Sequence, residues 1–288
     1  MLRWVDAEPR ATAALTGMAD EIGPDWRTRL GDAVWAQSNH VAQCLLIGLG
    51  IAVWNSIAHA VTPPVAVAGY SVGELAAYAA AGVLDDVDAQ RLAVLRAASM
   101  DLRVGSSNGG LLAVSRLAEP LIRSICRRFD LAVAIRNAPD HLIVGGKSAG
   151  LDAATREFAR LGAECGRLPI AIASHTPQMN AAAADFAAVL SDFRLSDARI
   201  PVATCFRGAA SRRADILRHD LAQQVCHTVQ WQRCMETIAE RRPECVLEVG
   251  PGTSLSRMWN AVYPNVPARS ADEFQSGSAI AGWLRRLR

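Results

Sequence analysis

The sequence has no strong excess of charge of either sign and almost no lysine. Its 30 Lys and Arg residues nearly balance 28 Asp and Glu residues, so the formal net charge is +2. Lys147 is the only lysine in the chain. Such a balance does not indicate a surface that binds nucleic acid or a charged membrane. We therefore expect neither nucleic acid nor a membrane as a partner.

Cysteine pairs and metal-type histidine spacings are also missing. The seven cysteines form no C-x-x-C pair, and their number is odd. Scattered cysteines in a chain of this size are typical of buried thiols in a reducing compartment. The six histidines show no H-x-x-x-H spacing, with which a helix can hold a metal ion. We expect no metal and no tightly bound cofactor.

The sequence also lacks a secretion signal and a long hydrophobic run. The N-terminal stretch MLRWVDAEPR carries charges early and has no apolar segment of the kind found in signal peptides. The longest apolar run is Cys44–Trp54. As a helix it is too short to cross a hydrocarbon layer about 30 Å thick. We expect a buried helix here, in a cytoplasmic protein.

The sequence does contain enough apolar residues for one substantial core. The chain has 288 residues, of which 51% are hydrophobic. Short β-rich runs alternate with helical runs, which favours an α/β fold. The pattern predicts a long helix over 39–60, a buried strand over Val65–Ala68 and a helix over 72–82 that ends at Gly82. Further helices are predicted over 87–102, 177–190, 217–225 and 231–240, and further strands over 202–206 and 245–249.

A compact series of elements in the middle of the chain predicts a second, smaller domain. Strands are expected over 111–114, 131–135, 142–144 and 168–172, and helices over 118–129 and 151–161. The order βαββαβ is that of a ferredoxin-like unit. A Ser-Ser-Asn-Gly-Gly loop at 106–110 precedes it. We therefore predict a large α/β domain over 1–106 and 173–288, with an inserted small domain over 107–172.

The segment Gly69-Tyr70-Ser71-Val72-Gly73 matches the pattern G-x-S-x-G. A predicted strand precedes it and a predicted helix follows, which is the context of a reactive serine. Small residues are expected at Gly69 and Gly73, because neighbouring backbone would strike a larger side chain. The turn would lift the Ser71 hydroxyl above the sheet edge, with the Val72 N–H nearest to a developing oxyanion. An ordinary glycine-flanked turn is the alternative.

Among the histidines, His175 is best placed to act as the base for Ser71. It follows the apolar run 170–173 and precedes Thr176-Pro177, which places it between a strand end and a helix start. Active-site groups of open α/β sheets gather at such positions. A structural histidine is the alternative. Other histidines flank the long helix, lie in a turn or stand among charges: His40, His59, His141 and His219.

Four segments together resemble the malonyl-CoA:acyl-carrier-protein transacylase family: GYSVGELAAYAAAGVL, LAVLRAASM, SHTPQM and LEVGPGTSL. The likeness covers nearly the whole chain, in the family's order. It implies an α/β-hydrolase-like parallel-sheet domain with an inserted ferredoxin-like small domain, in agreement with the predicted elements. Within the family, stretches such as VAIRNAPDHLIVGG and ARSADEFQSGSAIAGWL are most similar to the epsilon subunit of malonate decarboxylase.

The resemblance implies a role for each matching residue. Ser71 matches the acylated serine and His175 the catalytic histidine. Arg96 matches the arginine that pairs with the malonyl carboxylate, and Gln43 matches a glutamine that lines the site. In QVCHTVQW, His227 matches the position whose backbone carbonyl orients the catalytic histidine.

Two departures from the family pattern bear on the site. Thr228 stands where the family has proline, which affects the expected shape of that loop. The family also opens with a strand and a Gly-Gln-Gly-x-Gln loop, whose glutamine N–H completes the oxyanion hole. This chain opens at MLRWVDAEPR, which resembles the segment just after that loop. We therefore expect the chain as given to lack its first strand and half of its oxyanion hole, and to have low solubility and activity.

The expected function is transfer of a malonyl group from malonyl-CoA, through a Ser71 ester, to the phosphopantetheine-type thiol of an acyl carrier protein in malonate decarboxylase. One alternative is the malonyl transacylase of fatty-acid or polyketide synthesis. A second is an inactive, truncated module that only binds the carrier protein. A third is a serine hydrolase, which commonly has an orienting acid between serine and histidine in chain order. Aspartates in that interval include Asp101, Asp130, Asp140 and Asp152.

Overall fold

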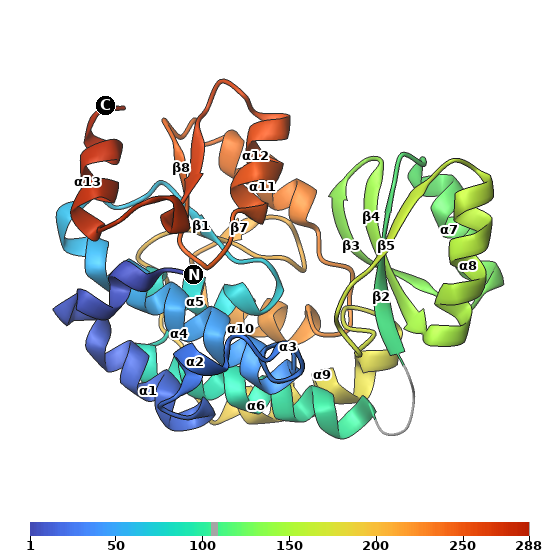
Figure 1. Cartoon of the computed structure of the whole chain (residues 1–288), viewed down its shortest axis with the longest axis horizontal. Helices are drawn as coiled ribbons and strands as arrows, with labels where there is room; N and C mark the ends of the chain where they lie inside the picture. The colour runs from blue at the N-terminus through green and yellow to red at the C-terminus, as the bar shows by residue number, and fades with distance from the viewer. Residues whose placement is uncertain (105–108, 288) are drawn as a thin grey trace.

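The computed structural model describes residues 1–104 and 109–287 (Figure 1). A large lobe carries both ends of the chain, and a small lobe stands beside it. Residues 106–108 of the predicted loop, and the predicted domain boundary between 106 and 107, lie outside the described residues. Gly109 and Gly110 belong to the first strand of the small lobe rather than to a loop.

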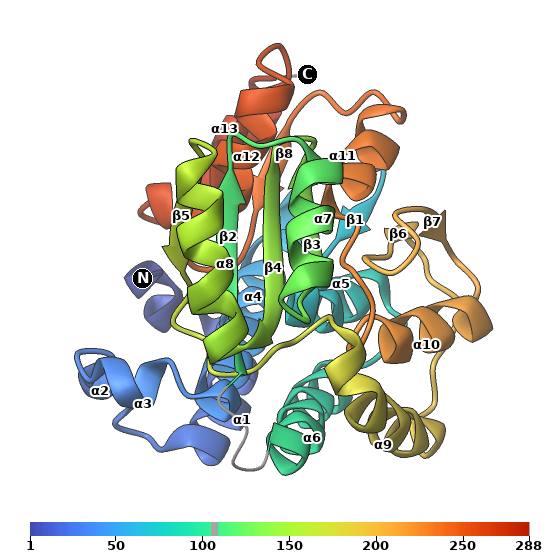
Figure 2. The same ribbon diagram turned by 90° about the vertical axis from the view of Figure 1, so that its right-hand side faces the viewer.

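The small lobe is a four-stranded antiparallel sheet with two helices on one face. Its sheet order is β3-β4-β2-β5. Figures 1 and 2 show both helices on the outer face of the sheet, and the other face turned toward the large lobe. The elements are β2 (Gly109–Ser115), α7 (Glu119–Arg128), β3 (Ala132–Ala138), β4 (His141–Lys147), α8 (Ser148–Arg160) and β5 (Glu164–Arg167).

The predicted βαββαβ order is confirmed, but the position of its last strand is wrong. The strand predicted over 168–172 lies at Glu164–Arg167, where it pairs with β2. Leu168 still donates its N–H to the Leu111 carbonyl. Pro169 follows it, and a proline has no N–H with which to continue the ladder. The chain therefore leaves the sheet edge just before the predicted strand.

The large lobe holds short strands between layers of helices. β1 (Val67–Ala68) pairs in parallel with β6 (Val202–Ala203), which pairs antiparallel with β7 (Ala210–Ser211). A separate parallel pair joins β8 (Val246–Glu248) to β9 (Ala268–Ser270). The α/β class is confirmed, although the strands are shorter than predicted. β6, for example, ends where the Gly208 N–H turns back to the Thr204 carbonyl.

The helices of the large lobe form most of its mass. They are α1 (Thr12–Ile22), α2 (Trp26–Arg29), α3 (Ala33–Ala36), α4 (Asn39–Ile57), α5 (Glu74–Ala81), α6 (Asp86–Val104), α9 (Asn180–Ser191), α10 (Ala214–Gln223), α11 (Trp231–Ala239), α12 (Ser254–Val262) and α13 (Gly277–Arg285). Helices α4, α5, α6, α9, α10 and α11 agree with their predicted spans within a few residues.

Helix α4 is the central helix of the large lobe. An 18-residue window of the segment Asn39–Ala60 has a mean hydropathy of 1.8, and 72% of that window is buried inside the fold. Gly48 lets α1 approach closely, because a Cβ at that position would lie 2.6 Å from the Met18 Cβ. This segment, unlike the shorter run Cys44–Trp54, is long and apolar enough to span a membrane, but its burial is that of a core helix, and the predicted buried helix is confirmed.

A hollow of about 510 Å³ separates β1 from β8. β1 is the edge of its sheet, and β8 has only β9 as a partner among the described strands. Mostly apolar side chains line the hollow, including Trp54 and Trp259. Gly69 and Gly73, which flank Ser71 in its turn, also line this hollow.

Candidate active site

Ser71 lies in a tight turn between β1 and α5. β1 ends at Ala68, and the short 3₁₀ turn Ser71–Gly73 leads directly into α5. A Cβ at Gly69 would overlap the backbone of Gly73 and Glu74, so this position requires glycine. Ser71 has a φ of 53°, in the left-handed region that residues with a side chain seldom occupy. The predicted strand-turn-helix context of Ser71 is therefore confirmed.

The corresponding prediction for Gly73 is wrong. A Cβ at Gly73 would meet no atom within 4 Å. Its φ of −56° and ψ of −16° are ordinary helical values. The direction of the turn is the reason. The backbone of Gly73 lies against Gly69, whereas its own side-chain position faces open space.

His175 lies directly beside Ser71. Its Nε2 is 2.7 Å from the Ser71 Oγ, and its Nδ1 is 2.5 Å from the backbone carbonyl of Gln224. A carbonyl only accepts hydrogen bonds, so Nδ1 carries the proton and Nε2 accepts from the Ser71 hydroxyl. The His175 N–H also donates to the Val225 carbonyl at 2.9 Å. The predicted helix start follows at Pro177, but the segment before His175 is not a strand.

The residue that orients His175 differs from the prediction. Gln224 supplies the carbonyl, not His227. Helix α10 ends at Gln223, so the next carbonyl is free to point at the imidazole. His227 is exposed, and its Nδ1 lies 3.0 Å from the Gln223 carbonyl and 3.2 Å from the Cys226 Sγ. Residues 224–226 separate the helix end from His227, so His227 lies too far along the chain to contact the imidazole.

None of the aspartates between Ser71 and His175 contacts the imidazole within the described residues. The Nδ1 partner is a backbone carbonyl rather than a carboxylate. The arrangement therefore differs from the serine-histidine-acid triad of hydrolases. This geometry disfavours the hydrolase alternative.

Arg96 is buried beside the reactive pair, with 1% of its surface exposed. Its Nη1 donates to the Gln43 Oε1 at 2.8 Å, and its Nη2 donates to the Gln224 Oε1 at 3.0 Å. The same Nη2 lies 3.4 Å from the Ser71 Oγ. Arg96 Nε is buried and has no hydrogen-bond partner in the described part of the chain. Nε and Nη2 share one edge of the guanidinium, so a carboxylate-binding edge faces the Ser71 region.

Gln43 belongs to this cluster as predicted, but it contacts the arginine rather than an open pocket. It lies on α4 and is 4% exposed. Its Nε2 donates to the Asn39 Oδ1 at 2.8 Å, which fixes its Oε1 toward Arg96. The effect of Gln43 is therefore to hold the guanidinium in place.

A buried carboxylate and a glutamine complete the cluster. The Gln224 Nε2 donates to the Ser71 carbonyl and to the Glu74 Oε2, both at 2.8 Å. Glu74 is fully buried on α5 and also accepts the Cys205 N–H. Gln224 thus contacts the serine, the histidine and the arginine at once.

Burial dominates the proton affinities in this cluster. It lowers the pKa of His175 to about 3, and the Arg96 charge acts in the same direction while the Gln224 carbonyl opposes it. Burial lowers the pKa of Arg96 to about 10, against the effect of Glu74. Burial raises the pKa of Glu74 to about 7, although its N–H donors and Arg96 oppose the rise. At neutral pH, His175 is therefore uncharged and can accept a proton.

Sequence reasoning does not identify Glu74 and Gln224. Glu74 gives only a weak signal, since it is the one charged residue in the alanine-rich helix ELAAYAAA. Gln224 gives little signal, because its contact with His175 runs through a backbone carbonyl that any residue type possesses.

The arrangement has the parts of a nucleophilic serine site. A hydroxyl contacts a neutral imidazole, and the imidazole is held in one tautomer. Val72 lies at the start of the helical turn, and in the described residues its N–H has no acceptor. Such an N–H can stabilise an oxyanion. Among the described residues, no group of three or more His, Cys, Asp or Glu side chains is arranged to hold a metal ion.

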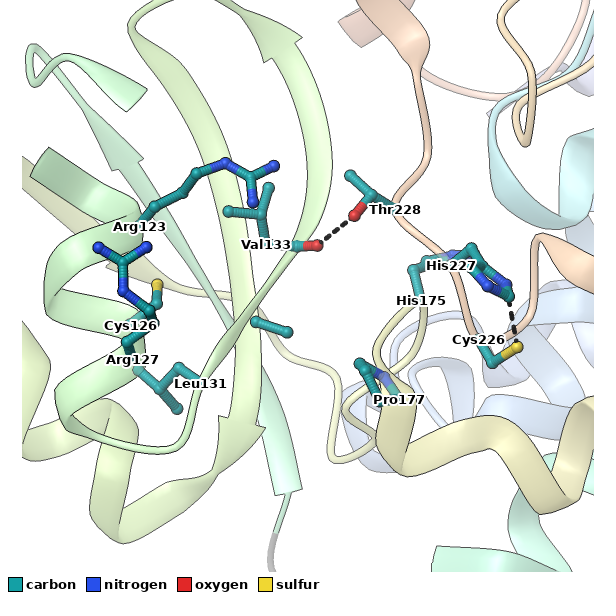
Figure 3. Close-up of a pocket in the computed structure, with 11 residues that line it drawn as sticks. Arg123, Cys126, Arg127, Leu131, Val133, His175, Pro177, Cys226, His227 and Thr228 are labelled. Carbon is teal, nitrogen blue, oxygen red and sulfur yellow. Dashed lines mark hydrogen bonds between the residues drawn. The ribbon is translucent and has the colours of Figure 1, made fainter. Parts of the chain in front are cut away.

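A cavity of about 310 Å³ opens between the two lobes and includes His175 in its wall (Figure 3). Helix α7 and β3 of the small lobe form one side, and Pro177 and the segment Cys226–Thr228 form the other. The Thr228 hydroxyl donates to the Val133 carbonyl at 2.7 Å across the gap. His175 therefore borders a cavity at the junction of the lobes.

Comparisons with known proteins agree with this geometry. The model of a family described as the acyl transferase domain matches residues 34–286. The malonyl CoA-acyl carrier protein transacylase of Escherichia coli O157:H7 is 26% identical over 265 residues, which is 89% of this chain and 81% of the relative. The same-named protein of Mycobacterium bovis is 32% identical over 206 residues, covering 72% and 68% of the two chains.

Solved structures show the same fold. The malonyl CoA-acyl carrier protein transacylase of Coxiella burnetii superposes with a TM-score of 0.91 at 23% identity, covering 100% of this chain and 93% of that one. A type II PKS acyl-carrier protein in complex with its malonyl-transacylase gives a TM-score of 0.89 at 24% identity, covering 96% and 92%. At these identities the likeness concerns the fold.

The turn at Ser71 gives a first prediction. Gly69→Ala is expected to lower the free energy of unfolding by about 3 kcal/mol, because the new methyl group overlaps backbone. Gly73→Ala is the matched control and is expected to leave stability nearly unchanged, because its methyl group enters open space. Urea unfolding of both variants measures the difference. Equal stability of the two variants would contradict the described turn.

The lowered pKa of His175 gives a second prediction, tested with a fluorophosphonate reagent that labels reactive serines. A histidine of ordinary pKa near 6.5 would lose about 30-fold in rate at pH 5 through protonation. His175 stays neutral down to about pH 3, so the labelling rate of Ser71 is expected to change by less than about twofold between pH 8 and pH 5. Glu74 has a pKa of about 7 and could itself cause a midpoint in this range, so the measurement is repeated in Glu74→Gln. A midpoint near pH 6.5 that persists in this variant would show that His175 has its ordinary pKa.

Proposed function

The chain belongs to the acyl transferase domain family, and from this premise we propose that it transfers a malonyl group from malonyl-CoA to an acyl carrier protein. The transfer would pass through an ester on Ser71 and end on the carrier's phosphopantetheine-type thiol. The observation that carries the proposal is the buried Arg96, whose Nε has no hydrogen-bond partner among the described residues and lies on the guanidinium edge beside Ser71. A serine next to a buried cation suits an acyl group with a free carboxylate.

The geometry accounts for each proton transfer. His175 Nε2 takes the proton of the Ser71 hydroxyl as the oxygen attacks the thioester carbonyl. The oxyanion that forms is stabilised by the Val72 N–H. As the C–S bond breaks, His175 returns the proton to the departing thiolate, and the malonyl ester remains on Ser71. The carrier thiol then reverses these steps, and it leaves as a malonyl thioester while Ser71 regains its proton.

Arg96 links substrate recognition to the strength of the base. A malonyl carboxylate can bind Nε and Nη2 side by side, whereas an acetyl group has no charge to offer. The Arg96 charge is also one of the causes that lower the pKa of His175. A bound carboxylate offsets that charge, which raises the pKa of His175 toward its ordinary value. The correct substrate would thus make His175 a stronger base.

The setting in malonate decarboxylase is the finer part of the proposal. Its support is the similarity of GYSVGELAAY, VAIRNAPDHLIVGG and the C-terminal stretch to the epsilon subunit of that complex. The two relatives described above are malonyl CoA-acyl carrier protein transacylases, and this favours the transfer reaction itself. Transfer rates to carrier proteins of malonate decarboxylase and of fatty-acid synthesis would separate the two settings.

The proposal includes a cytoplasmic location and no tightly bound cofactor, with malonyl-CoA as a substrate. All seven cysteines, which lie within the described residues, are free thiols. A reducing compartment suits that state. A carrier-binding module without activity is the remaining alternative, and detection of a covalent intermediate would exclude it.

A covalent intermediate is the third prediction. Protein exposed to malonyl-CoA and analysed by intact-mass and peptide mass spectrometry is expected to carry one malonyl group on Ser71. Ser71→Ala should carry none. His175→Ala should acylate at least about 100-fold more slowly, because the general base is lost. A malonyl group on a cysteine instead of Ser71 would overturn the assignment.

Substrate preference is the fourth prediction. Arg96→Ala is expected to reduce kcat/KM for malonyl transfer by about 30-fold more than for acetyl transfer, as expected when one partner of a buried charge pair is lost. The ratio of the two substrates within one variant corrects for any general loss of folded enzyme. Arg103→Ala is the control, since Arg103 lies on the same helix but is 43% exposed. Equal losses for both acyl groups would show that Arg96 has only a structural role.

A further inference from the structure

The side-chain amide of Gln224 lies between a buried cation and a buried carboxylate. Its Oε1 accepts a hydrogen bond from the Arg96 Nη2 at 3.0 Å, and its Nε2 donates to the Glu74 Oε2 at 2.8 Å. The same Nε2 donates to the Ser71 carbonyl at 2.8 Å. In the described part of the chain, Arg96 and Glu74 make no direct hydrogen bond or ion pair with each other. The two charges are therefore joined through this amide.

The orientation of the Gln224 amide is set by the groups around it. The oxygen of a glutamine amide only accepts hydrogen bonds, and the nitrogen only donates them. A guanidinium only donates, whereas a carboxylate and a backbone carbonyl only accept. If the amide turned over, its nitrogen would face the Arg96 donor, and its oxygen would face the acceptors of Glu74 and Ser71. Three satisfied contacts would be replaced by three unsatisfied ones, which is costly in a buried site.

Glu74 is itself held on both sides of its carboxylate. It is the first residue of α5, and none of its surface is exposed. Its Oε1 accepts the N–H of Cys205, which lies just after β6, and its Oε2 accepts the Gln224 amide. Because both oxygens face donors, the ionised carboxylate fits here, and a proton on either oxygen would oppose one of them. Gln224 therefore meets a fixed acceptor on this side.

We propose that Glu74 is a positioning residue for substrate selection, which holds the Gln224 amide in the orientation that fixes the Arg96 guanidinium. The proposal rests on the proposed function, because that function gives Arg96 a malonyl carboxylate to bind. Arg96 is held at two points, with Nη1 on Gln43 and Nη2 on Gln224, and this leaves its Nε and Nη2 edge beside Ser71. Loss of the Gln224 contact would free that edge to turn away, so the effect of Glu74 reaches the substrate through Gln224 and Arg96.

A purely electrostatic role for Glu74 predicts the opposite effect on substrate preference. The Glu74 charge partly offsets the Arg96 charge, and it raises the pKa of Arg96 against the larger effect of burial. Removal of that charge alone would leave Arg96 more attractive to a malonyl carboxylate, so the preference for malonyl over acetyl would rise. Loss of the amide orientation would lower the same preference. The sign of the change therefore distinguishes the two roles.

The fifth prediction concerns the ratio of kcat/KM for malonyl-CoA to kcat/KM for acetyl-CoA, measured at pH 8. Glu74→Gln is expected to lower this ratio about tenfold, because the new amide cannot accept from both the Cys205 N–H and the Gln224 amide. Glu74→Asp keeps the charge but is shorter by one methylene group, and it is expected to lower the ratio at least about threefold. Glu240→Gln is the control, since Glu240 is exposed at the end of α11.

A double-mutant cycle tests whether Glu74 acts through Gln224. Gln224→Ala removes the amide but keeps the backbone carbonyl that binds His175. This variant is expected to lower the ratio about tenfold, and the addition of Glu74→Gln should lower it by less than about threefold more. Losses that multiply to about 100-fold in the double variant would contradict the proposal, because Glu74 and Gln224 would then act independently.

The ratio of the two substrates within one variant corrects for loss of folded enzyme, and fluorophosphonate labelling of Ser71 counts the reactive fraction. A ratio that rises in Glu74→Gln, or that is unchanged in both Glu74 variants, would overturn the positioning role. If Glu74→Gln does not fold, Glu74→Asp and Gln224→Ala decide the question, and an unchanged ratio in either would overturn it. A wild type that transfers malonyl no better than acetyl would refute the proposed function instead.

Discussion

The burial of one positive charge determines how this site is built. A guanidinium removed from water is costly unless polar groups surround it. Arg96 is 1% exposed and is held by the side-chain oxygen of Gln224, with the Glu74 carboxylate one contact further away. The backbone of Gln224 also holds His175, and its amide holds the backbone of Ser71. The contacts that compensate the charge are therefore the contacts that align the nucleophile and its base.

The parts of this protein that depend on short stretches of sequence are the parts that could be predicted. The turn at Ser71 follows from Gly69 and from the flanking strand and helix patterns, and the long apolar run predicts α4. The βαββαβ order follows from element spacing alone. His175 is identified by its position between an apolar run and a helix start. The family resemblance then adds Arg96.

Features set by contacts between distant segments could not be predicted in this way. His227 is the wrong orienting residue because the end of α10 decides which carbonyl points at the imidazole, and the sequence places that end only approximately. Gly73 was expected to be crowded, but the direction of the turn leaves it free. The polar contacts of Glu74 join three segments that are far apart along the chain.

The strained backbone conformation of the two reactive residues affects which variants a screen for heat resistance would favour. Ser71 and His175 have φ values of 53° and 62°, which disfavour any residue with a Cβ by about 1–2 kcal/mol. Glycine in place of the small Ser71 side chain would relieve that cost and remove the reactive hydroxyl in the same step. Screening for heat resistance alone would therefore enrich inactive sequences. Thermostable forms of such a site have to be sought elsewhere in the chain, with both residues held fixed.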